Sequence, residues 1–287
     1  MRSVKFLIAA GAASLLSTAA FAADMPSIMP APQYYAPPPQ DFGGWYLRGD
    51  VGITSQHATN ISNPLDTTLN VTGPSYAGTG LSGAGTWDVG VGYAFNSWLR
   101  GDITAEYRNA ASLKGSVYGQ FSAFGGTFSD VDNYSANLSS LVFLANAYID
   151  LGTWFCLTPF VGVGAGMAQH RFSGMTDVGY ISDGTTGFGY AAADSSEWKF
   201  AWALHAGVAY NVTNNFKMEL AYRYLNMGDV NTSIINCASS GCVSNGPRAF
   251  YTMQNFDAQE IKFGMRWMLQ PEQQQQPAYM PPLVRKG

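Results

Sequence analysis

Hydrophobic and polar residues alternate along eight separate segments of the chain, and the alternation has a period of two. The segments are 44–54, 86–95, 98–108, 139–150, 158–168, 198–210, 216–224 and 256–268. A period of two places successive side chains on opposite faces of an extended strand. In the second segment, for example, Trp87, Val89 and Val91 share one face, while Asp88 and Gly90 share the other. The pattern predicts eight β-strands, each with one apolar face.

The polar faces of these strands carry too little charge to cover the exterior of a soluble protein. A soluble β-sandwich or lipocalin-like barrel turns its apolar face inward and carries abundant charge outside. Placing the polar face inside and the apolar face against lipid satisfies every strand at once. The sequence therefore predicts an all-β fold, an eight-stranded antiparallel up-and-down transmembrane β-barrel.

The connections between the predicted strands alternate between short and long. Residues 96–97, 151–157 and 211–215 form the short links, and the other four links each run to about 30 residues rich in Gly, Ser, Thr, Asn and Asp. Barrels of the outer membrane have short periplasmic turns and longer extracellular loops. We therefore expect short periplasmic turns at one end and four long extracellular loops at the other.

Aromatic side chains gather at both ends of the predicted strands. Those near the short links are Trp45, Tyr93, Phe95, Trp98, Trp154, Phe155, Tyr210, Phe216 and Trp267, and those near the long links are Trp87, Tyr107, Trp198 and Tyr224. Two girdles of aromatic rings mark the two interfaces of a membrane. The rings thus agree with the predicted strands.

Charged residues on the polar faces are expected to point into the barrel lumen. The bases are Arg48, Arg100, Arg108, Lys199, Lys217, Arg223, Lys262 and Arg266, the acids are Asp50, Asp88, Asp102, Glu106, Asp150, Glu219 and Glu260, and His205 faces the same way. An eight-stranded barrel has an interior just wide enough for side chains to fill it. Because unpaired ions away from water are costly, near-equal charges predict an ion-pair network that plugs the lumen. The alternative is that the same residues line a pore.

Both ends of the chain differ in composition from the alternating region. Residues 1–22 combine basic residues, an apolar segment and an A-x-A motif at 20–22, which is typical of a secretory signal peptide. The Pro-rich segment 23–42 and the Gln- and Pro-rich segment 270–287 predict a periplasmic linker and a disordered tail around a barrel at 43–269. Because an even number of strands returns the chain to the side it entered, both termini are expected in the periplasm.

Charge and hydropathy exclude two further classes of protein. The 287 residues include 15 basic and 19 acidic side chains, a net charge of −4. A nucleic-acid-binding protein needs a basic face, so nucleic acid is not an expected partner. No stretch of eighteen consecutive apolar residues follows residue 22, which excludes a bundle of membrane-spanning helices.

Cysteine and histidine residues offer few sites for chemistry. Cys237 and Cys242 lie in a loop-like CASSGC segment, where an oxidising compartment favours a disulfide, whereas Cys156 is expected to be buried. His57 and His170 fall in two of the predicted loops and could together hold haem or a metal, although isolated loop histidines are more often solvated. Catalysis needs a base beside a nucleophile or a pair of acids. No such set is evident, so we expect no enzyme activity, no catalytic residue and no resident metal or cofactor.

Five segments carry a resemblance to a known family. They are GGWYLRGDVG (43–52), DLGTWFCLTPFVGVGAG (150–166), FAWALHAGVAYNVT (200–213), ELAYRYLNMGD (219–229) and KFGMRWML (262–269). Together they resemble the alphaproteobacterial outer-membrane β-barrel surface-protein family, a porin-like family akin to the OmpA-type eight-stranded transmembrane domain. The resemblance implies a Gram-negative outer membrane, contact with its lipid and lipopolysaccharide, and insertion by the barrel-assembly machinery. Family members usually end on an aromatic residue, whereas Trp267 is followed here by a tail.

The loops are the expected working part of the protein. They hold Asp66, Asp130, Asp132, Asp177, Asp183, Asp194 and Asp229 against Lys114, Arg171 and Arg248, which predicts an acidic outer surface. Their tyrosines, phenylalanines and glycines suit adaptable contact with a host or surface ligand. The resemblance implies a barrel that lends integrity to the membrane and presents these loops. Two other functions stay open, a narrow porin for small solutes and a haem- or host-ligand-binding receptor that uses His57 and His170.

Overall fold

The computed structural model describes residues 43–64, 66, 71–123, 125–191, 193–238 and 250–269. They belong to one compact unit of the chain, residues 41–287. The predicted signal peptide (1–22), linker (23–42) and tail (270–287) lie outside the described residues. In the described part of the chain, no helix is both long enough and apolar enough to cross a membrane.

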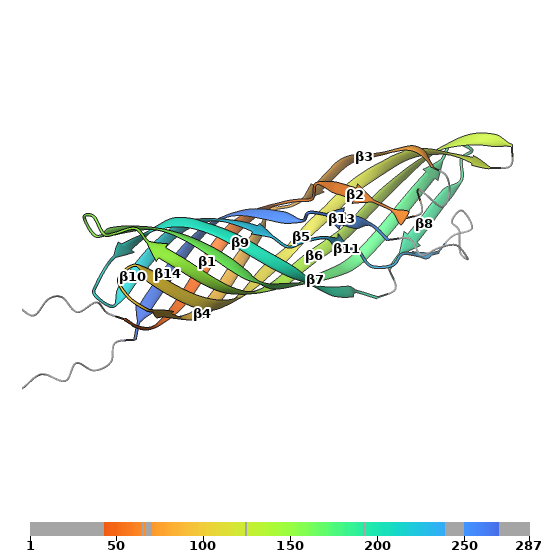
Figure 1. Ribbon diagram of the computed structural model, residues 1–287. Coiled ribbons are helices and arrows are strands. Elements are labelled where there is room, and N and C mark those ends of the chain that lie inside the picture. Colours follow the sequence, from red (N-terminus) through yellow and green to blue (C-terminus); the bar gives the residue numbers. More distant parts are fainter. Residues whose placement is uncertain are drawn as a thin grey trace, which may run out of the picture. The chain divides into compact units, whose positions relative to one another are not determined.

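Eight antiparallel strands form a closed ring, as the sequence predicts (Figure 1). In order around the ring they are β4 (Ala84–Ala94), β1 (Gly44–His57), β14 (Asp257–Met268), β10 (Phe216–Asn226), β9 (Ser195–Asn211), β7 (Leu157–Ile181), β6 (Gly126–Asp150) and β5 (Leu99–Ala123), which pairs with β4 again. The first and last strands, β1 and β14, pair with each other and close the ring. Their register runs from Tyr46 opposite Met268 to His57 opposite Asp257. Each of the eight strands therefore has a hydrogen-bonded neighbour on both sides, as a barrel in lipid requires.

Three strands extend far beyond the bounds that the alternation indicates. β5, β6 and β7 have 25 residues each. Their additional residues occupy much of the second and third long links, which therefore contain more β-structure than the sequence analysis assigned. The inner face explains the extension, because Leu113, Val117 and Leu138 continue the alternation there and are buried.

The lengthened strands continue as an open sheet outside the ring. β3 (Thr72–Leu81) pairs with β5, β8 (Thr186–Tyr190) pairs with β7, and β12 (Asn236–Cys237) pairs with β8. We call β3, β8 and β12 together with the outer parts of β5, β6 and β7 the extracellular sheet (Figure 1). A second, three-stranded sheet is formed by β11 (Val230–Asn231), β13 (Thr252–Gln254) and β2 (Asn60–Ser62). Side chains from the two sheets share one buried apolar cluster.

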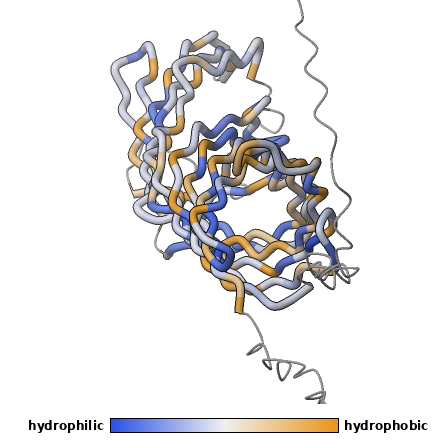
Figure 2. The backbone as a smooth tube through the Cα atoms, turned by 90° about the vertical axis from the view of Figure 1, so that its left-hand side faces the viewer, coloured by the Kyte–Doolittle hydropathy of each residue, from blue (hydrophilic) through white to orange (hydrophobic). Residues whose placement is uncertain are grey.

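Outward-facing side chains divide the surface of the strands into an apolar band and a polar belt. On β7 the outward positions are apolar from Leu157 to Met167, and Gln169 follows. On β6 the outward positions change from apolar to polar at about the same level, between Leu141 and Ser139. With a rise of about 3.3 Å per residue and a tilt near 40°, the apolar stretch of β7 is roughly 25–28 Å tall, which matches the band of a membrane barrel. Hydrophobic and hydrophilic positions alternate along the ring strands in Figure 2.

Aromatic rings lie at both edges of the apolar band. At the short-turn end, the Tyr93 ring packs edge-on against both Trp45 and Phe95, with centroids 5.3 Å apart in each pair. At the opposite end, Trp202 and Tyr224 lie 5.5 Å apart. These positions agree with the two interfaces that the sequence predicts.

Gly166 on β7 leaves no room for a side chain. A Cβ atom there would lie 1.9 Å from the backbone oxygen of Phe143 on β6. We predict that Gly166→Ala destabilises the barrel by about 1–3 kcal/mol, because the backbone of β6 has to shift. Gly49→Ala is the matched control, since its nearest contact would be an ordinary 3.7 Å from the Asp88 backbone oxygen. Urea unfolding of barrels refolded into vesicles measures both variants, and equal stabilities would contradict this close approach of β6 and β7.

Candidate functional site

The barrel lumen is lined by two unlike walls. Strands β1, β4, β5, β10 and β14 supply most of the charged side chains, whereas β7 and β9 supply small residues such as Gly162 and Ala203. The small residues are needed for space. A Cβ at Gly162 would lie 2.4 Å from the Tyr148 ring, and a Cβ at Gly264 would lie 1.9 Å from the Asp50 carboxylate. Each of these glycines thus makes room for a longer side chain on the neighbouring strand, Tyr148 beside Gly162 and Asp50 beside Gly264.

An upper charge cluster is centred on Glu106 of β5. It consists of Asp88, Glu106, Arg108, Arg223, Glu260 and Lys262. Three cations meet the Glu106 carboxylate, Arg108 Nη1 at 3.1 Å, Arg223 Nη2 at 2.5 Å and Lys262 Nζ at 2.6 Å. Lys262 also pairs with Asp88, and both arginines pair with Glu260. Three bases thus balance three acids, which is the condition for burying such charges without an uncompensated ion.

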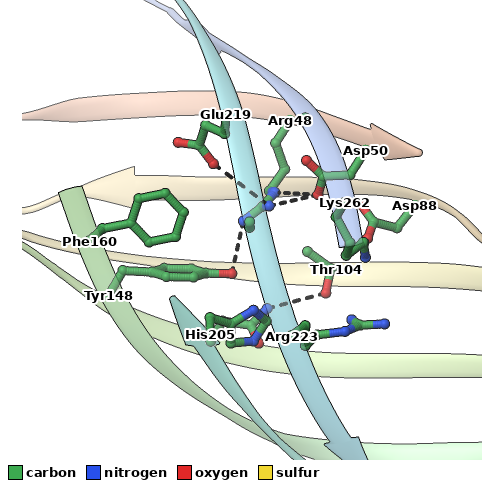
Figure 3. Close-up of a pocket in the computed structure, with 13 residues that line it drawn as sticks. Arg48, Asp50, Asp88, Thr104, Tyr148, Phe160, His205, Glu219, Arg223 and Lys262 are labelled. Atoms are coloured by element: carbon green, nitrogen blue, oxygen red, sulfur yellow. Dashed lines mark hydrogen bonds and ion pairs between the residues drawn. The ribbon is translucent and has the colours of Figure 1, made fainter. Parts of the chain in front are cut away.

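A lower charge cluster lies nearer the short-turn end of the lumen. It consists of Arg48, Asp50, Arg100, Asp102, Asp150, Glu219 and Arg266. Arg48 donates to Asp50 at 2.6 Å and to Asp102 at 2.8 Å, and Figure 3 shows its guanidinium between Asp50 and Tyr148. The Glu219 carboxylate is shared by Arg266 at 2.9 Å, Arg100 at 3.6 Å and Arg48 at 3.9 Å. The cluster ties β1, β5, β6, β10 and β14 together across the lumen.

Aromatic side chains complete the lower cluster. The Tyr148 hydroxyl lies 2.8 Å from Arg48 Nη1 and accepts its hydrogen bond. The Arg100 guanidinium lies 4.1 Å from the centroid of the Tyr148 ring and 4.7 Å from that of Phe160, within the range of cation–π attraction. Tyr46 donates a hydrogen bond of 3.0 Å to Asp102. The sequence analysis did not count these rings as partners, although Tyr46 and Tyr148 already stood on the polar faces of their strands.

Little free space remains among the lumen side chains. The room available to the centre of a water molecule beside Arg48, Asp88, His205 and Arg223 amounts to about 10 Å³. A buried water needs about 10–15 Å³ by this measure. The free space beside these four side chains therefore corresponds to about one water molecule.

Two of the remaining predicted lumen residues, Lys199 and Lys217, lie at the margins of the clusters, whereas His205 lies between them beside Arg223. Lys199 pairs with Glu197 at 2.6 Å near the extracellular rim, where its side chain is 27% exposed. Lys217 is the cross-strand neighbour of Arg266 at the opposite end. His205 is buried, and its ring centroid lies 5.2 Å from that of Tyr148.

An apolar cap fills the barrel beside and above the upper charge cluster. It consists of Leu113, Val117, Tyr134, Ala136, Leu138, Val142, Leu144, Ala168, Phe172, Met175, Ala201, Ala203, Leu225, Met227, Val230, Tyr251, Met253, Phe256 and Ala258, all buried. These residues come from the lumen face of β6, β7 and β9, from the inner face of the extracellular sheet, and from 225–230 and 251–258. The sequence analysis missed the cap because most of its members lie in links that were interpreted as loops. The period of two at Leu113, Val117 and Leu138 was the signal that could have revealed it.

The structure does not bring His57 and His170 together. His57 is exposed on the outer face of β1, whereas His170 is 1% exposed and faces inward from β7. His170 Nδ1 lies 2.9 Å from Ser140 Oγ, and its ring packs against Phe256. The two imidazoles point to opposite sides of the barrel wall and cannot share one haem or metal. Ser140 is itself buried, so its pairing with His170 is closed to substrates.

The cysteines differ from the expectation at one position. Cys156 is exposed rather than buried. It follows Phe155 in the tight turn between β6 and β7, where both residues have positive φ, 49° at Phe155 and 67° at Cys156. A turn that projects beyond the sheet has no interior in which to bury a side chain. Cys242 lies outside the described residues, so its disulfide with Cys237 stays a prediction.

No metal site emerges from the acidic and histidine residues. Within the described ranges, no group of three or more His, Cys, Asp or Glu side chains is placed to hold a metal ion. Part of the acidic charge assigned to the loops instead lies against the inner face of the extracellular sheet. Asp132 of β6 lies opposite Gly179, and the Asp177 carboxylate of β7 accepts a 3.0 Å hydrogen bond from the Tyr251 hydroxyl. The outer surface is therefore less acidic than the composition of the loops suggests.

Burial changes the protonation of these aspartates. It raises the pKa of Asp132 to about 8, with further contributions from the negative charges of Asp177 and Asp130. Burial likewise raises the pKa of Asp177 to about 6, which the hydrogen bond from Tyr251 partly opposes. At neutral pH the protonated form is therefore favoured for Asp132, whereas Asp177 becomes protonated only below about pH 6.

Comparison with known families gives a match over most of the chain. Residues 8–240 match the family described as the outer membrane protein beta-barrel domain. The chain belongs to this family. Membership confirms the predicted resemblance, the barrel fold and the outer-membrane location.

Individual proteins of this kind are similar to the chain over most of its length. An uncharacterised protein of Brucella suis is 32% identical over 275 residues, which cover 87% of this chain and 93% of that protein. A putative adhesin of Rickettsia prowazekii is 24% identical over 228 residues, covering 77% and 87% respectively. Among solved structures, the outer membrane protein OprG from Pseudomonas aeruginosa matches 79% of this chain and 97% of its own, with 13% identity and a TM-score of 0.44.

Loss of the Glu106 charge should destabilise this outer-membrane barrel strongly. Glu106→Gln leaves Arg108, Arg223 and Lys262 without their shared carboxylate, and breaking a buried ion pair costs about 3–5 kcal/mol. Glu197→Gln is the matched control, because its pair with Lys199 is partly exposed and should contribute no more than about 1 kcal/mol. Urea unfolding in vesicles reports both values. A Glu106→Gln barrel as stable as the control would show that the upper cluster does not hold the strands.

The buried aspartates should make the extracellular sheet less stable as the pH rises. A carboxyl whose pKa is raised on folding contributes stability that is complete below the ordinary carboxyl range and is lost as the pH rises through about 8 for Asp132. We expect more amide hydrogen exchange in residues 126–139 at pH 9 than at pH 5.5, after correction for intrinsic rates. Asp132→Asn should reduce this difference. Asp183→Asn, at a fully exposed turn, should leave it unchanged; a sheet equally protected at both pH values would contradict the expectation.

Proposed function

We propose that this protein is a non-conducting outer-membrane barrel that contributes to membrane integrity and acts through its extracellular sheet, in the manner of an adhesin. One observation carries the first half of the proposal. The lumen is filled twice, by paired charges at two levels and by the apolar cap beside and above the upper level. The side chains around Arg48 and Arg223 leave room for about one water molecule.

The orientation of the barrel follows from its turns and strands. The three short turns belong on the periplasmic side, and an even number of strands returns the chain to the side from which it enters. Both termini are then periplasmic, and the extracellular sheet stands outside the cell. There it is in reach of lipopolysaccharide and of a host or surface ligand.

The adhesin-like role draws on the extracellular sheet and on one relative. The outer parts of β5, β6 and β7 amount to far more structure than closing a barrel requires. A relative of similar length is a putative adhesin. A plugged lumen leaves the outer surface as the part of the molecule that can meet a partner.

Single-channel recording in planar bilayers tests the non-conducting lumen. We expect no current steps from folded wild-type barrels, with folding confirmed by a heat-dependent shift in gel mobility. The reason is that the described side chains of the two charge clusters leave space for about one water molecule beside Arg48 and Arg223. Reproducible steps from demonstrably folded protein would favour the narrow porin instead. Uptake of small sugars by proteoliposomes provides an independent readout.

A shortened variant separates the two halves of the proposed role. Replacing residues 112–137 by a tight turn removes the β5–β6 part of the extracellular sheet and keeps the ring strands. In cells lacking the protein, this variant should restore the resistance of the outer membrane to detergent. It should not restore the adhesion of these cells to a surface or to other cells. Restoration of both would place the contact elsewhere on the molecule.

A further inference from the structure

Apolar side chains reappear on the outer face of the extracellular sheet, beyond the polar belt. The strand register brings them together in two neighbouring rows that cross β5, β6, β7 and β8 in that order. One row is Ser116, Asn133, Val178 and Phe188, and the other is Tyr118, Val131, Tyr180 and Thr186. Tyr190 lies one row nearer the membrane. We call Tyr118, Val131, Val178, Tyr180, Phe188 and Tyr190 the aromatic patch. Its four rings are 42–51% exposed. Phe188 and Tyr190 stack with centroids 6.2 Å apart.

The aromatic patch is not part of the membrane girdle. Between it and the apolar band lie the outward residues of the polar belt, among them Ser112, Asn137, Ser139 and Arg171. Polar side chains link the strands nearby, as in the 2.8 Å hydrogen bond between Ser135 and Thr176. A patch of exposed rings beyond the bilayer marks a surface for interaction with a protein or with another membrane.

We propose that the aromatic patch binds the same patch on a second copy of this protein in an apposed membrane. The inference deepens the proposed adhesin-like function by naming the partner. It rests on that function only in requiring that the extracellular sheet makes the contact.

The chemistry of the patch favours a second copy. Among the described residues of its rows, Lys114 at the margin is the one charged side chain, so two patches meet without the repulsion that like charges impose. Aromatic rings pair with aromatic rings in offset or edge-on geometry, which makes the patch self-complementary. A two-fold axis satisfies both copies with one set of contacts. An acidic or basic partner would find no charge of opposite sign here beyond Lys114.

The size of the patch indicates a weak contact that becomes effective in arrays. Four aromatic side chains that are about half exposed offer roughly 400 Å² per copy. Two copies would bury roughly 800 Å², below the 1,200 Å² or so of a stable complex. Many copies on two apposed membranes would compensate through avidity. We therefore expect clustering of membranes that carry the protein, and no stable dimer of isolated barrels.

Vesicles of phosphatidylcholine and phosphatidylglycerol carrying folded protein test the contact by light scattering. Wild-type vesicles should cluster, whereas nanodiscs with one barrel each should not associate at micromolar concentration. Tyr180→Asp vesicles should stay dispersed, because facing carboxylates repel and each lost ring contact weakens binding about tenfold. Tyr180→Lys vesicles should also stay dispersed. Mixing the Asp and Lys vesicles should restore clustering, since opposite charges then face each other.

Controls separate the self-contact from other partners. Ile234→Ser removes an equally exposed apolar side chain outside the patch and should leave clustering unchanged. Dispersed wild-type vesicles, or Tyr180→Asp vesicles that cluster like wild type, would overturn the inference. So would clustering of wild-type vesicles with protein-free ones, which identifies lipid as the partner, or failure of the mixed variants to cluster. None of these results bears on the non-conducting lumen, which the bilayer recordings test separately.

Discussion

Closure of the backbone hydrogen-bond ring is the constraint on which the rest of this structure depends. Lipid offers no partner for an unpaired strand edge, so the chain must pair β14 with β1 to exist in a membrane at all. With eight strands, closure produces a lumen only as wide as its side chains. Every second residue of every strand is then forced into that space. The ion pairs, the glycines beside long side chains and the edge-on contacts of Tyr148 with Phe160 and His205 are the ways in which this sequence fills it.

Carboxylates in the lumen lie where several cations can share them. Glu106 and Glu219 each pair with three cations, so removing either carboxylate would leave several positive charges without their shared partner. Small residues on the facing wall are part of the same arrangement. The Tyr148 ring occupies the space beside Gly162, and from there it contacts the Arg100 guanidinium. A Cβ atom at Gly162 would therefore displace the Tyr148 ring and disturb a charge cluster to which Gly162 itself does not belong.

The sequence alone predicts most of the ring and of the lumen lining, because both depend only on the period of two. It predicts Glu106 and Lys262 as inward-facing, but not as partners, since their contact depends on strand register and on the tilt of β5 against β14. The bounds of β5, β6 and β7 were underestimated for a physical reason. Where a strand leaves lipid, its outer face becomes Ser and Asn, so the contrast between the two faces weakens and the segment resembles a loop. The apolar cap and the pairing of Ser140 with His170 were missed with it.

One continuous sheet thus extends from the lipid bilayer into water, and the residue types on its outer face change where the surroundings change. Apolar residues face lipid, Ser and Asn face water, and both assignments follow from transfer energetics alone. The aromatic patch breaks this correspondence, because its rings face water at a height where Ser and Asn are the rule. Keeping exposed rings there lowers solubility without adding to the core beneath, which Leu113, Val117 and Phe172 already fill. A residue pattern that solvent does not explain and packing does not need is best explained by a partner.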